Sequence, residues 1–220
     1  MTTEALMASV VALGNFAPAM FHPSWFARHG LIAEAEAAAS AKSPGLSISD
    51  AHATFAFSGI EFHALHDRLQ FATSREDMHH PLKDLVASTL ALLDATPVSS
   101  MGINWSKHSK APNEDKWHEF GHRLAPKEFW NKNWTGHAGM LRVHMRLERT
   151  DSKLGSVNVN VDPSSEIRPG IYCRFNDHYE FSEKSASAGF AALLINEVWG
   201  SSKESALKMI RALEEDLNNG

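Results

Sequence analysis

The segment Ser156–Asp162, with the sequence SVNVNVD, indicates the fold class more clearly than any other stretch of the chain. Its valines and asparagines alternate, so in a strand the valines face one side of a sheet and the asparagines face the other. The preceding residues 139–150 also alternate, and the link between the two ranges contains Asp151, Ser152 and Gly155, which favour turns. The pattern predicts an antiparallel hairpin.

Other extended segments surround this hairpin in the sequence. Strands are predicted over residues 171–181, 99–107, 52–57 and 60–73, the last two forming an antiparallel meander with turns at Ser58-Gly59 and His66-Asp67. The short apolar range 5–13 is rich in valine and leucine, and we expect it to be a strand buried on both faces.

Helical periodicity is strongest in two parts of the chain. Apolar residues repeat at helical spacing over 82–93, and Ser74 with Asp77 three residues later has the pattern of a capping box before this mid-chain helix. The C-terminal range 185–217 is predicted to be helical and amphipathic, with a break at Gly200. Shorter helices are predicted over 23–30, 33–41 and 114–125, the last capped by Asn113.

Antiparallel strands with helices set between them, rather than strict strand–helix alternation, predict an α+β fold with a largely antiparallel sheet. We expect one domain over residues 1–220, because no linker is long and polar enough to separate two. Each half also ends in a long helix. A duplicated strands-then-helix unit, with halves of about 1–96 and 97–220, therefore remains open.

The composition excludes several classes of protein. The chain is 43% hydrophobic and 21% charged, as in globular proteins, and its single cysteine, Cys173, fits a reducing compartment. Its net charge of −5 and the lack of a dense basic cluster disfavour nucleic acid. No apolar run reaches the ~18–20 residues that span a bilayer, and the N-terminus lacks the basic start of a signal peptide. We therefore expect a cytoplasmic protein without a membrane segment.

The only catalytic motif is His118-Glu119-Phe120-Gly121-His122, which fits H-E-x-x-H. In the zinc-hydrolase interpretation His118 and His122 bind Zn²⁺, and Glu119 is the general base. These five residues resemble the helix core of zinc-dependent peptidases. The alternative interpretation is structural. Apolar residues at i, i+3, i+4 and i+7 form a packing stripe, with the two histidines beside it. The spacing selects no third ligand, so we favour the structural interpretation and expect no metal or other cofactor.

A resemblance that covers more of the chain also favours the structural interpretation. The motifs GNF (14–16), FHPSWF (21–26), LKDLV (82–86), GIN (102–104), WH (117–118) followed by GHRLAPKE (121–128), and NDHYE (176–180) resemble a family of bacterial cytoplasmic proteins of unknown function. In that family the position of Glu119 is not fixed as glutamate, which implies that His118 and His122 are structural. The resemblance implies no activity, cofactor or partner.

Two groups of residues are candidates for binding. Trp130 and Trp134, flanked by polar residues, would mark a protein–protein contact if they are exposed; the alternative is that they pack against the edge of the sheet. Asn176, His178 and Glu180 share one strand face and could line a ligand pocket, or could pair across the sheet with Asn158 and Asn160. The sequence thus favours a non-catalytic protein that binds a partner protein or a small ligand, or that self-associates. The zinc-dependent hydrolase is the alternative.

Overall fold

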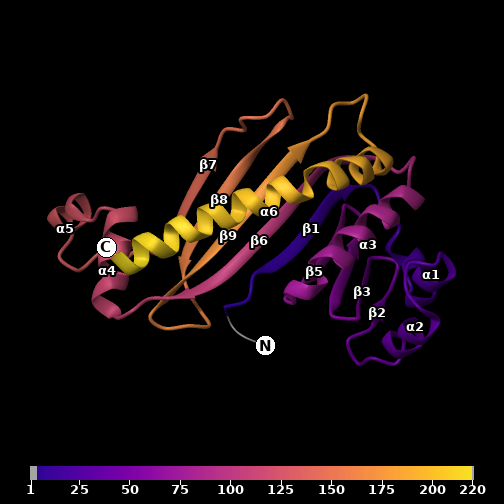
Figure 1. The fold of residues 1–220 in the computed structure, drawn as a ribbon, viewed down its shortest axis with the longest axis horizontal. Helices are drawn as coiled ribbons and strands as arrows, with labels where there is room; N and C mark the ends of the chain where they lie inside the picture. Colours follow the sequence, from indigo (N-terminus) through magenta and orange to yellow (C-terminus); the bar gives the residue numbers. More distant parts are fainter. Residues whose placement is uncertain (1–3, 220) are drawn as a thin grey trace.

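A computed structural model describes residues 4–219. Within this range nine strands form one antiparallel sheet, in the order β2-β3-β4-β5-β1-β6-β9-β8-β7 (Figure 1). The strands are β1 (Met7–Gly14), β2 (Ser47–Ile48), β3 (His52–Phe57), β4 (Ile60–Leu65), β5 (Arg68–Thr73), β6 (Val98–Lys110), β7 (Val143–Leu147), β8 (Gly155–Pro163) and β9 (Gly170–Glu180). The helices are α1 (Pro23–Arg28), α2 (Glu34–Ser40), α3 (His79–Leu92), α4 (Glu114–Leu124), α5 (Glu128–Asn133) and α6 (Ala188–Asn219), with 3₁₀ turns at Pro18–Met20 and Glu76–Met78. The α+β prediction is confirmed.

The strand order is related in the two halves of the chain. β1 and β6 pair at the centre, and the last strand of each half, β5 or β9, lies next to the first strand of that half. Each run of strands is followed by a long helix, α3 in the first half and α6 in the second. A common origin of the halves stays a prediction.

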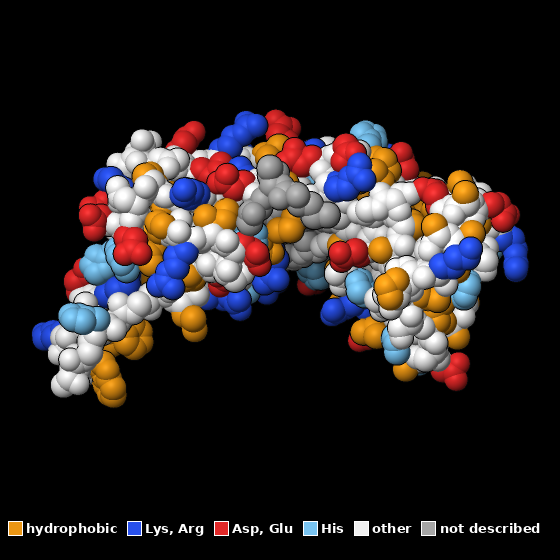
Figure 2. Space-filling model, turned by 90° about the horizontal axis from the view of Figure 1, so that it is seen from below, with side chains coloured by type: hydrophobic (Ala, Val, Ile, Leu, Met, Phe, Trp, Pro, Cys, Tyr) orange, Lys and Arg blue, Asp and Glu red, His pale blue; other side chains and the backbone are white. Residues whose placement is uncertain are grey.

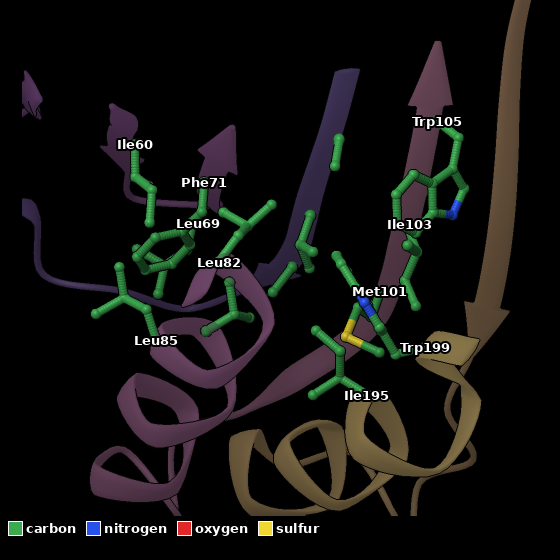
Figure 3. Packing of buried hydrophobic residues seen from close by; sticks show 14 of the residues in the cluster. Ile60, Leu69, Phe71, Leu82, Leu85, Met101, Ile103, Trp105, Ile195 and Trp199 are labelled. Atoms are coloured by element: carbon green, nitrogen blue, oxygen red, sulfur yellow. The ribbon is translucent and has the colours of Figure 1, made fainter. Parts of the chain in front are cut away.

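The hydrophobic core lies between one face of the sheet and the helices α3 and α6 (Figures 1 and 3). Figure 3 shows Leu82 of α3 and Ile195 of α6 pointing toward side chains of the central strands. Trp105 of β6 is fully buried, and its indole N–H donates to the hydroxyl of Ser202 in α6 at 3.1 Å. Its ring centroid is 4.8 Å from that of Trp199. These contacts fix α6 along the sheet.

The opposite face of the sheet has no helix over it in the described part of the chain. Seen edge-on in Figure 2, the molecule is arched, and the hollow is on the side away from α6. In β1, Ala8, Val10 and Ala12 are buried against the helices, whereas the intervening Val11 is only half-buried. The expectation that this strand is buried on both faces was therefore wrong, because the helices cover one face only.

Three other boundaries differ from the predictions. The C-terminal helix is continuous through Gly200, because its packing against the sheet outweighs the roughly 1 kcal/mol that glycine costs in a helix. The mid-chain helix begins at His79, and its N-cap is Met78, without a side-chain cap, rather than the predicted Ser74. The strand expected over 139–150 is limited to β7, because the preceding residues are irregular.

Candidate functional site

Helix α4 carries the HEFGH segment and begins at a well-formed N-cap. The side-chain oxygen of Asn113 accepts a hydrogen bond from the backbone N–H of Lys116 at 2.9 Å, which confirms the predicted cap. One side of α4 packs against the protein. Phe120 is fully buried, and the indole N–H of Trp117 donates to the carbonyl oxygen of Gly170 at 2.9 Å. The predicted packing stripe is therefore present.

The charged and histidine side chains of this motif lie on the exposed side of α4. Glu119 accepts a hydrogen bond from the ammonium of Lys116 at 3.2 Å, and His122 Nε2 is 3.3 Å from the carboxylate of Glu128. Within residues 4–219, no group of three or more His, Cys, Asp and Glu side chains is placed so that it could hold a metal ion. The zinc interpretation therefore finds no third ligand beside His118 and His122.

A pocket of about 400 Å³ lies next to α4. It is lined by Trp117, His118, Gly121, His122, Lys127, His137, Ala138, Gly139, Met140 and Pro163. The ammonium of Lys127 donates to the carbonyl oxygen of Gly121 at 2.9 Å, and burial lowers the pKa of this lysine. The wall thus combines imidazole and ammonium groups with indole and thioether surface. It suits a group that is acidic at one end and apolar at the other.

The largest group of exposed apolar side chains near this pocket is in and after α5. We call Phe129, Trp130, Trp134 and Leu141, which are 68%, 60%, 74% and 86% exposed, the aromatic patch. Figure 2 shows hydrophobic side chains at the tip of one end of the molecule, where Figure 1 places α5. The sequence singled out the two tryptophans within the aromatic range 129–134 but missed Leu141.

The aromatic patch lies within a basic part of the chain. Residues 123–146, here called the basic segment, contain five Lys and Arg residues and one glutamate, a net charge of +4 in a chain whose total is −5. Arg123 and Arg142 form exposed ion pairs with Asp216 and Asp162. Lys132 and Arg146 form no ion pair within the described residues. Lys132 is in the same helix as Phe129 and Trp130, so this part of the surface is chemically suited to an acidic group.

The second group of candidate residues lies on the uncovered face of the sheet. Asn176 is directly opposite Asn158 in β8 and Asn104 in β6, and its side-chain amide donates to Asn104 at 2.7 Å. Asn158 donates to Asn176 at 3.4 Å. These amides bond one another across the strands, which agrees with the cross-strand interpretation.

His178 and Glu180 lie further along the same strand, with His178 Nε2 3.8 Å from the carboxylate of Glu180. The structure does not bring them together with the tryptophans. α4 is bound at Gly170, the first residue of β9, and Glu180 is its last residue, about 33 Å away along an extended strand.

Sequence reasoning also missed a buried polar cluster at the far end of β9. Arg149 binds the carboxylates of Asp177 and Asp151, and the hydroxyl of Tyr179 donates to Asp177 at 2.7 Å. The cluster attaches the loop that joins β7 and β8 to the neighbouring strand β9. Cys173 is buried in the core, which raises the pKa of its thiol to about 12, so it remains a protonated thiol at neutral pH.

Comparison with known proteins adds no information about this site. No protein-family model matches the chain, and no curated protein matches it. None of the helices in residues 4–219 has the length and apolar character needed to cross a membrane.

Proposed function

We propose that this chain is a soluble, cytoplasmic, non-catalytic protein that binds an acidic partner protein through the aromatic patch. The observation that supports this most directly is the exposure of Trp130 and Trp134, at 60% and 74%, on a short helix and at its C-terminal end, within the basic segment. Tryptophan is enriched among the residues that contribute most to protein–protein binding. The pocket beside α4 would then take an acidic side chain of the partner.

A second copy of the chain fits this surface less well. The commonest dimers have two-fold symmetry, which brings the same surface of each copy face to face. Such a dimer through the aromatic patch would place Lys132 and the rest of the basic segment near their own symmetry mates. Like charges brought together at an interface oppose association. A different protein with an acidic rim around an apolar centre fits better.

The test is a photo-crosslinking amino acid at position 134, followed by purification of the captured protein and titration against the full chain. Trp130→Ala/Trp134→Ala should weaken binding by at least about thirtyfold, the effect of losing one strong anchor residue. The control is Leu193→Ala, which removes an equally exposed apolar side chain, 74% exposed, from the distant N-terminal half of α6. It should leave the affinity unchanged.

Two outcomes would contradict the proposal. If Leu193→Ala weakens binding as much as the tryptophan variant, the aromatic patch is not the interface. If the purified chain forms a dimer in sedimentation and Trp134→Ala dissociates it, the patch binds a second copy instead.

A further inference from the structure

The strand β7 (Val143–Leu147) forms one edge of the sheet. It pairs with β8 on one side, and on its outer side no backbone hydrogen bond is made by residues 143–147 within the described chain (Figure 1). The opposite edge of the sheet is β2, which has only two residues. β7 is therefore the edge with enough length to pair with another extended segment.

The two faces of β7 differ in chemistry. Val143, Met145 and Leu147 lie opposite the valines of β8 on the side of the helices, and Met145 is 53% exposed because α6 does not cover this edge. On the other face His144 and Arg146 lie opposite Asn160 and Asn158 and are exposed. The edge thus presents an apolar row on one face and a basic row on the other.

We propose that β7 binds an extended segment of the acidic partner as a tenth strand, in which apolar residues alternate with Asp or Glu. This inference rests on the proposed function and specifies the partner. In such pairing the backbone groups supply hydrogen bonds, and alternate side chains supply specificity. Acidic side chains of the added strand would lie beside His144 and Arg146, and its apolar side chains beside Met145.

Self-pairing of β7 fits the charges poorly. In an antiparallel pair of identical strands, directly opposite residues must come from the same face. When the two copies of β7 overlap in full, Arg146 would face His144 of the second copy, and a shift of two residues can place Arg146 opposite Arg146. Like charges directly opposite each other destabilise a strand pair. The charge pattern therefore favours an acidic strand over a second copy.

The edge is continuous with the proposed binding surface. β7 begins two residues after Leu141 of the aromatic patch, and Pro163 at the end of β8 lines the pocket beside α4. A strand bound along β7 would end near this pocket. A single partner could therefore occupy the edge, the pocket and the patch together.

The experiment is a titration of the isotope-labelled full chain with two capped peptides, SVEVEVS and SVKVKVS, followed by amide chemical shifts. SVEVEVS should shift the amides of residues 143–147, and SVKVKVS should bind at least about fivefold more weakly, as expected for exchanging attractive for repulsive cross-strand pairs. Arg146→Glu should reverse this preference. The exposed Arg146 makes this substitution compatible with the fold.

Equal binding of both peptides would overturn the inference, and so would shifts with SVEVEVS that fall outside β7. Absence of any binding would do the same. Trp130→Ala/Trp134→Ala should leave SVEVEVS binding within twofold of the unmodified chain. If this variant loses partner binding but still binds the peptide, the aromatic patch and the β7 edge act independently. The proposed function and the β7 inference can therefore fail separately.

Discussion

The buried cluster at Arg149 allows a quantitative prediction of stability. The side chains of Arg149 and Asp177 are 8% and 6% exposed, whereas Asp151 is 43% exposed. Removing one partner of a buried ion pair costs about 3–5 kcal/mol, because the remaining charge is buried without compensation. Arg149 keeps Asp151 as a partner, so Asp177→Asn should lower the free energy of unfolding by about 3 kcal/mol, the lower end of that range.

Urea unfolding followed by tryptophan fluorescence and circular dichroism measures this loss. The matched control, Asp151→Asn, breaks an exposed pair and should cost no more than about 1 kcal/mol. Arg149→Met combined with Asp177→Asn should cost clearly less than the two single changes added together, because both remove the same interaction. Equal losses for Asp177→Asn and Asp151→Asn would refute the argument that burial determines the cost.

Two further predictions concern other parts of the fold. Burial, and then the nearby charge of Lys203, lower the pKa of His79 below 6.5, so the folded state prefers the neutral ring. The free energy of unfolding should therefore fall as the pH drops below 6.5, by up to about 1.4 kcal/mol per pH unit until the folded-state pKa is reached. Urea unfolding at pH 7.5 and 5.5 measures this dependence of the free energy of unfolding on pH. His79→Gln should remove the dependence, whereas His80→Gln, at an exposed histidine, should leave it unchanged. If His79→Gln keeps the full dependence, another group causes it. Gly200→Ala should raise the melting temperature and increase the free energy of unfolding by about 1 kcal/mol, because Gly200 is inside a helix and nothing lies within 4 Å of the added carbon. Gly155→Ala should instead destabilise the protein, because φ is +122° and the added carbon would lie 2.1 Å from a backbone oxygen.

The periodic parts of the chain gave reliable predictions of the sheet and its helices. Alternation in SVNVNVD identified β8 and the residues on each of its faces, because its valines face the helices and its asparagines face the uncovered side of the sheet. The strand order could not be obtained this way, because pairing of β1 with β6 joins segments about ninety residues apart. The assumed break at Gly200 failed because a local propensity is smaller than the packing of a 32-residue helix on a sheet.

The candidate site was predictable only in part. Trp130 and Trp134 were identified as candidates for an exposed contact because polar residues flank them in sequence, but packing against the sheet edge remained the alternative. The short helix α5 was not predicted, since six residues give too little periodicity to recognise. The pocket could not be inferred either, because it joins α4 to residues 137–140 and to Pro163, which come together only through the packing of α4 near the start of β9.

The aromatic residues of α4 and those in and next to α5 differ in what they do for the fold. Phe120 is fully buried and Trp117 is held by a hydrogen bond, so together they anchor α4. Trp130 and Trp134, only a few residues later, contribute little buried area to this chain. Large exposed aromatic groups carry a cost in solubility, and scattered apolar residues do not normally include two tryptophans on one six-residue helix and its end. Because the packing of the fold uses little of these side chains, their exposure supports the proposal that they contact another protein.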